Sequence, residues 1–114
     1  MRPDLDERTI EKLQKLGGRK LLSQMVELFT SHAESAIRDA SSGLAQGNLD
    51  TVRRAAHSLK SSAGNLGATR VQILADEIEQ LAEQEAGNIQ PFLSDLQNAY
   101  LRAKDRLTKV VEGI

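Results

Sequence analysis

The sequence contains no cysteine and no tryptophan, and only 3% of its 114 residues are aromatic. The lack of cysteine excludes disulfides, thiolate catalysis and cysteine-based zinc sites. Because aromatic residues are scarce, the core must consist mostly of Leu, Ile, Val and Ala, a composition that favours packed helices. A chain this small that uses no disulfide fits a reducing compartment, so we expect a cytoplasmic protein.

An excess of charge of one sign is also missing, as are long apolar runs. Fifteen basic and sixteen acidic residues leave a formal net charge of -1, which gives no general attraction to nucleic acid or to an acidic membrane surface. No apolar run approaches the roughly 20 residues that span a bilayer, and Met1–Asp4 precede no apolar stretch of a signal peptide. We therefore expect neither nucleic acid nor a membrane as a partner, and separately we expect a monomer.

Apolar residues instead recur with the 3.6-residue period of helices, and no segment shows the strict alternation of a strand. Asn48 is the expected N-cap of the third helix. The sequence predicts an all-α fold, an antiparallel up-down four-helix bundle with a short additional N-terminal helix, as a single domain over residues 1–114. The expected helices cover about Asp6–Leu16, Arg19–Gln46, Leu49–Leu66 and Thr69–Glu85, and a last helix begins near Pro91.

The third helix places His57 away from its apolar stripe. On the helical wheel, the imidazole lies about 140° from Val52, on the solvent side. Ser61 and Gly64 follow it by one and two turns, and their small size leaves room over the ring for a partner or a phosphoryl group. A mid-helix glycine costs about 1 kcal/mol relative to alanine, so it needs a compensating reason. Lys60 can reach an anion bound at the ring as a point charge.

From physical arguments alone, two other interpretations stay open. A single exposed histidine on a helix is usually an ordinary surface residue, and small residues in a bundle often serve close helix packing. His32, the other histidine, is expected to be a residue at the edge of the bundle. Neither histidine has a carboxylate or histidine partner at zinc-binding helical spacing, so we expect no metal site.

The stretch Ala55–Ala68, with the sequence AAHSLKSSAGNLGA, resembles the phosphorylation-site motif of histidine-containing phosphotransfer (HPt) domains of multistep two-component phosphorelays. That motif has a His, an aliphatic residue two positions on, a Lys at the third position, and a small-rich run that ends in Gly. Most members have Gly directly after the Lys, where this chain has the still small Ser61. Further similar stretches are Leu5–Asp6, Leu16–Gly18, Leu28–Phe29, Gly47–Leu49 and Glu77–Glu79.

The resemblance implies a role for each residue of the motif. His57 would accept a phosphoryl group on its outer ring nitrogen from a receiver-domain aspartate or a kinase, and pass it to a response-regulator aspartate. Lys60 would support the transfer, and Glu79 of the neighbouring helix would orient the other ring nitrogen, although an ordinary solvated Glu79 stays an alternative. Access to the ring and partner docking would depend on Arg53, Ser61, Gly64 and Gly67.

The partner implied is a receiver domain of a response regulator or hybrid sensor kinase, which would also supply Mg²⁺. The chain has no Gly-rich phosphate loop and no Walker lysine, so we expect a phosphocarrier that binds neither ATP nor a cofactor, and not an enzyme. We also expect a small apolar docking patch beside His57, with Ile73 facing outward. The alternatives are a helical-bundle adaptor that binds a signalling partner without chemistry and, as the weakest, a bundle hydrolase or metalloenzyme.

Overall fold

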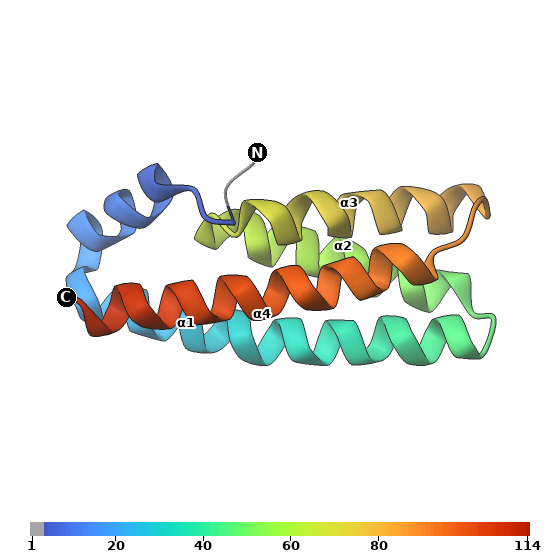
Figure 1. The fold of residues 1–114 in the computed structure, drawn as a ribbon, viewed down its shortest axis with the longest axis horizontal. Helices are drawn as coiled ribbons and strands as arrows, with labels where there is room; N and C mark the ends of the chain where they lie inside the picture. Colours follow the sequence, from blue (N-terminus) through green and yellow to red (C-terminus); the bar gives the residue numbers. More distant parts are fainter. Residues whose placement is uncertain (1–3) are drawn as a thin grey trace.

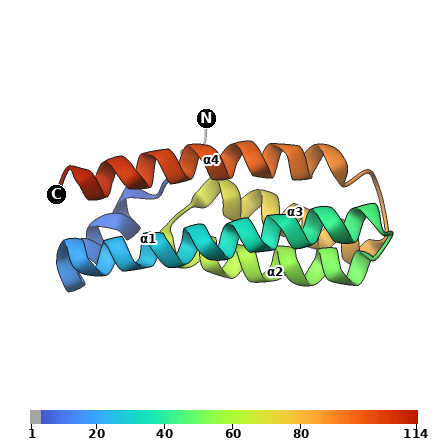
Figure 2. The ribbon, with the colours of Figure 1, turned by 90° about the horizontal axis from the view of Figure 1, so that it is seen from below.

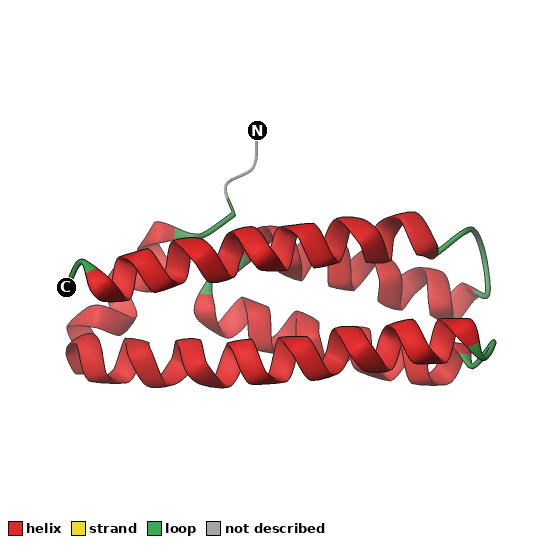
Figure 3. Cartoon of the chain, turned by 60° about the horizontal axis from the view of Figure 1, so that its bottom comes forward, coloured by secondary structure: helices red, strands yellow, loops and turns green. Residues whose placement is uncertain are grey.

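The computed structural model describes residues 4–114, and Figure 3 shows only helices and loops in this part of the chain. The helices run up and down in turn along one bundle axis (Figure 1). This arrangement confirms the predicted antiparallel four-helix bundle. Residues 1–3, which belong to the predicted domain and to the N-terminal stretch judged not to be a signal peptide, lie outside the described residues. The helices are α1 (Glu7–Ala45), α2 (Leu49–Leu66), α3 (Thr69–Gln84) and α4 (Gln90–Glu112).

The short additional helix is the first part of α1, and it is separated from the rest by Gly18. This residue has φ 64° and ψ -157°, a backbone conformation that residues with a side chain rarely adopt. The chain therefore changes direction at Gly18, and the residues before it fold back toward the connection between α2 and α3 (Figure 1). There the Asp6 amide donates to the Gly67 carbonyl at 2.7 Å, which anchors the short helix.

Each helix packs against two neighbours, in the order α1, α2, α3, α4 around the bundle. In the view from below, α4 lies along one side of the bundle and α1 and α2 lie beside each other along the other side (Figure 2). The interior is aliphatic, apart from the tilted contact between Phe29 and Tyr100, whose ring centroids lie 5.9 Å apart. Fully buried large side chains come from all four helices: Leu22, Phe29, Val52, Leu59, Leu66, Val71, Ile78, Leu96 and Leu107.

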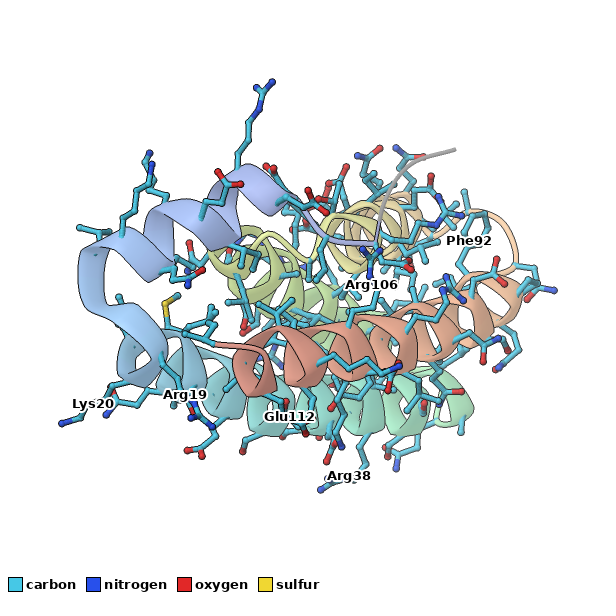
Figure 4. All side chains as sticks on the ribbon, turned by 60° about the vertical axis from the view of Figure 1, so that its left-hand side comes forward. Arg19, Lys20, Arg38, Phe92, Arg106 and Glu112 are labelled. Carbon is cyan, nitrogen blue, oxygen red and sulfur yellow. The ribbon has the colours of Figure 1, made fainter. Side chains whose placement is uncertain are left out.

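Charged side chains such as Lys20 and Arg38 extend outward from α1 (Figure 4). Within residues 4–114, none of the helices has both the length and the apolar character that a membrane-spanning segment requires.

The ends of α2 set its position against α3. Asn48 caps the start of α2, since its side chain accepts a hydrogen bond from the Thr51 amide at 3.1 Å, which confirms the predicted N-cap. Gly67 ends α2 with φ 77°, and only Gly67 and Ala68 separate it from α3. So short a connection forces the two helices to lie antiparallel and side by side.

Two glycines near the end of α2 should respond to substitution in opposite ways. Gly64 is helical, and a Cβ there would meet only the flexible end of the Gln72 side chain, with Nε2 at 2.8 Å. Gly64→Ala should therefore leave the free energy of unfolding unchanged or raise it by up to about 1 kcal/mol. Gly67→Ala should lower it by at least about 1 to 2 kcal/mol, the cost of a left-handed residue with a side chain.

Urea denaturation followed by circular dichroism measures both effects. Gly67→Ala has an added cost, because its Cβ would lie 2.9 Å from the Thr9 Cβ and 3.2 Å from the Asp6 carbonyl oxygen. Equal stability of the two variants would contradict these backbone assignments.

Candidate functional site

α2 presents His57 on its outer side. The apolar residues Val52, Ala56, Leu59 and Ala63 of this helix are buried, whereas the His57 side chain is 59% exposed. The helical period that buries the first group therefore turns the imidazole out, as the sequence predicts. The backbone that carries the ring belongs to a regular helix whose inner face packs in the core, an arrangement that positions side chains more precisely than a loop does.

Glu79 of α3 contacts the ring directly. Its Oε2 lies 2.6 Å from His57 Nδ1, and its side chain is only 9% exposed. It is the one charged residue among the buried residues of the described chain. The alternative of an ordinary solvated glutamate is therefore wrong, because this carboxylate is buried at the α2–α3 interface and is paired with the histidine.

Lys60 binds the other oxygen of the same carboxylate. Its Nζ lies 2.6 Å from Glu79 Oε1 and 3.3 Å from Asp76 Oδ1. Both oxygens of Glu79 are thus hydrogen-bonded, one to the imidazole and one to the ammonium group. These two hydrogen bonds offset the free-energy cost of burying a carboxylate, which would be large if the group had no partner.

The ionised Glu79 carboxylate sets the tautomer of the histidine. Burial alone would raise the pKa of the Glu79 carboxyl, but hydrogen bonds from Lys60 and His57 outweigh burial, so this pKa lies below its usual value. The pKa of Lys60 is raised, mainly by its hydrogen bond to Glu79. An ionised carboxylate can only accept hydrogen bonds. Nδ1 of His57 therefore carries the hydrogen, and in the neutral ring Nε2 keeps its lone pair.

The pairs across α2 and α3 follow one antiparallel register. His57 faces Glu79 and Lys60 faces Asp76, while Gly64 lies against Gln72. Gly64 therefore lies under a side chain of α3, and its small size lets that side chain approach the helix. The space that was predicted to stay open at Gly64 is therefore occupied by Gln72, which a single-helix wheel could not reveal.

The residues predicted for access and docking make no hydrogen bond with the His57 ring in the described part of the chain. Arg53 pairs with Asp50 one turn earlier, at 3.0 Å, and Ser61 is exposed. Gly67 is buried against Asp6 and Thr9. Gly67 is therefore not available for the docking that was predicted for it, and has a structural role instead, because the short N-terminal helix covers it.

A hollow between α1 and α2 lies on the other side of the His57 helix. His32 of α1 borders it, and His32 Nε2 lies 2.8 Å from the hydroxyl oxygen of Ser58, the residue next to His57. Leu28 lies at this hollow with 72% of its surface exposed. The lining residues are Met25, Leu28, Phe29, His32, Ser58, Ser62, Asn65 and Leu66.

Ile73 of α3, which the sequence predicted as an outward apolar residue, is only partly exposed.

Asp76 is the site residue that sequence reasoning missed. It precedes Glu79 by three positions, so both carboxylates lie on one face of α3, but their shared contact with Lys60 depends on the register between two helices. His32 was correctly expected at the edge of the bundle, and its contact with Ser58 likewise requires the packing of α1 on α2.

The model of the Hpt domain family matches residues 24–113, which include all four site residues His57, Lys60, Asp76 and Glu79. The chain belongs to the Hpt domain family. No curated protein sequence is significantly similar to it.

Two solved structures share this Hpt fold. Histidine-containing phosphotransfer protein B (HptB) from Pseudomonas aeruginosa PAO1 has 20% sequence identity and a TM-score of 0.91, over 100% of this chain and 99% of that one. A rice protein assigned as a histidine-containing phosphotransfer protein has 23% identity and a TM-score of 0.84, over 96% of this chain and 82% of the other. At these identities the likeness establishes the fold, and the family match carries the assignment.

If Glu79 fixes the ring of this Hpt domain, its removal should change the tautomer of His57. Long-range ¹H–¹⁵N spectra of the neutral ring should show hydrogen on Nδ1 in the native protein. In Glu79→Ala the acceptor is gone, so signal from the tautomer with hydrogen on Nε2 should appear. Asp105→Asn, which breaks only the exposed Lys109–Asp105 pair of α4, serves as the control. An identical tautomer with and without Glu79 would refute this role.

Proposed function

We propose that His57 is the residue of this Hpt domain that accepts and donates the phosphoryl group. Hpt domains act by histidine phosphotransfer in phosphorelay signalling, and this chain has two histidines. The observation that supports this proposal is the contact of 2.6 Å between His57 Nδ1 and Glu79 Oε2, which leaves Nε2 as the nucleophile. In His32, by contrast, Nε2 is engaged by the Ser58 hydroxyl.

The transfer follows from this tautomer. The Nε2 lone pair forms the N–P bond while the bond from phosphorus to the aspartyl oxygen of the phosphorylated receiver breaks, and its electron pair stays on the released carboxylate. The hydrogen on Nδ1 stays in place, so the phosphorylated ring is a cation beside the Glu79 carboxylate. Such a cationic ring is a good leaving group, and the same steps in reverse pass the phosphoryl group to the next aspartate.

Lys60 and Glu79 have supporting roles in this proposal. Glu79 holds the ring in one tautomer and orientation and stabilises the cation that forms during transfer. Lys60 keeps Glu79 ionised and places a positive charge one helical turn from the imidazole, where it offsets the charge of the phosphoryl group. An adaptor that only bound a partner would need neither the buried carboxylate nor its two hydrogen-bond donors.

The partner in this proposal is a receiver domain, the type of domain with which Hpt domains interact. It would dock over His57 and the hollow between α1 and α2, where Leu28 supplies exposed apolar surface. We expect the receiver to contribute the aspartate and the Mg²⁺, and this chain to act as a phosphocarrier without ATP binding, a cofactor or turnover of its own. The cytoplasmic location and the monomeric state stay predictions from the sequence.

The variants His57→Gln and His32→Gln test the assignment of the acceptor. A receiver domain that transfers label to the native chain is selected from a panel, and labelled protein is mapped by mass spectrometry. We expect acid-labile phosphate on His57 in the native protein and in His32→Gln, and no labelling of His57→Gln. Full labelling of His57→Gln would overturn the proposal.

The choice of glutamine keeps the test free of folding artefacts. Its amide can donate to Glu79 Oε2 in place of Nδ1, so the buried carboxylate keeps a partner. Because position 57 is exposed, the free energy of unfolding should change by less than about 1 kcal/mol. Urea denaturation of both variants checks this, so that a loss of labelling reports on chemistry.

A further inference from the structure

The ammonium group of Lys60 is shared between two carboxylates that differ in environment. Glu79 is nearly buried, whereas the Asp76 side chain is 42% exposed. The contact with Asp76 is also the longer one, 3.3 Å against 2.6 Å. The Lys60–Glu79 ion pair is therefore the stronger of the two. In the Lys60–Asp76 pair, another anion can more easily take the place of Asp76.

Asp76 is nevertheless held in place. Its Oδ2 accepts a hydrogen bond from the side-chain amide of Gln80 at 2.9 Å, one turn further along α3, which leaves Oδ1 directed at Lys60 Nζ. The aspartate thus restrains the ammonium group from its α3 side. Nothing in the proposed transfer step uses Asp76, so this restraint needs a separate explanation.

Phosphorylation would add a third anion to this cluster. Lys60 follows His57 by one helical turn, so a phosphoryl group on Nε2 would compete with Asp76 and Glu79 for one ammonium group. Asp76 opposes the phosphorylated state in two ways, because it holds back the lysine and adds a like charge nearby. Both effects act on the phosphorylated form more than on the free form.

We propose that Asp76 is a positioning residue that sets the phosphorylation equilibrium of His57 through Lys60. This inference rests on the proposed function of His57. By keeping Lys60 on the α3 side, Asp76 keeps the phosphoryl group from being over-stabilised on this chain, so that the group can pass on to the next aspartate. In the phosphorylated protein, Lys60 and the phosphoryl group then form an ion pair that Asp76 weakens.

The test measures the equilibrium constant for phosphoryl exchange between this protein and one phosphorylated receiver domain, the same in every reaction. In Asp76→Asn, the equilibrium should shift about two- to fivefold toward phosphorylated His57, the effect expected of one partly exposed ion pair. Asparagine can still accept from Gln80 and preserves the shape of the side chain. The equilibrium does not depend on how well the two proteins dock, since docking changes only the rates in both directions.

Further variants test whether the shift depends on the charge at position 76 and whether it acts through Lys60. Asp76→Glu should restore an equilibrium near that of the native protein, and Asp105→Asn, which removes an exposed carboxylate of α4, should leave it unchanged. In the background of Lys60→Ala, Asp76→Asn should lose most of its effect, because the aspartate acts through the lysine. An undiminished shift in that background would overturn the role of Lys60 and leave only direct repulsion.

Failure of this inference is distinct from failure of the proposed function. If His57 carries the label and Asp76→Asn has the native equilibrium, Asp76 has no positioning role. If the label is found on another residue, the proposed function itself falls. Unfolding curves of all variants verify that each protein in the comparison is folded.

Discussion

The candidate site depends on one buried carboxylate. Glu79 of α3 lies at the interface with α2, and its two oxygens accept hydrogen bonds from His57 Nδ1 and Lys60 Nζ, each at 2.6 Å. A buried carboxylate without partners would cost several kcal/mol. The need to satisfy Glu79 therefore fixes the histidine tautomer, restrains the lysine and links α2 to α3, so that stability and reactivity have the same origin.

The rest of the fold keeps this contact in register. The two-residue connection at Gly67 and Ala68 makes α2 and α3 antiparallel neighbours, and the short helix before Gly18 is anchored on that connection through Asp6. Aliphatic side chains fill the interior below the site. Reactive side chains on rigid helices keep their geometry better than side chains on loops, which suits a residue that must meet partners repeatedly in the same orientation.

The sequence predicted the helices well because apolar periodicity and capping residues such as Asn48 are local signals. It also placed His57 outward, and the family resemblance paired His57 with Glu79. It did not show that Gly64 lies under Gln72, that Gly67 is covered by the N-terminal helix, or that Lys60 also binds Asp76. Each of these depends on the register between helices, whereas a helical wheel describes one helix alone.

The central claim is that Glu79 holds Nδ1 and thereby leaves Nε2 of His57 to carry the phosphoryl group. The most direct test is the coupling between ³¹P and ¹⁵N in phosphorylated protein with ¹⁵N-labelled histidine. The account predicts phosphorus bonded to Nε2 of His57, with the hydrogen still on Nδ1. Phosphorus bonded to Nδ1, or to either nitrogen of His32, would contradict it.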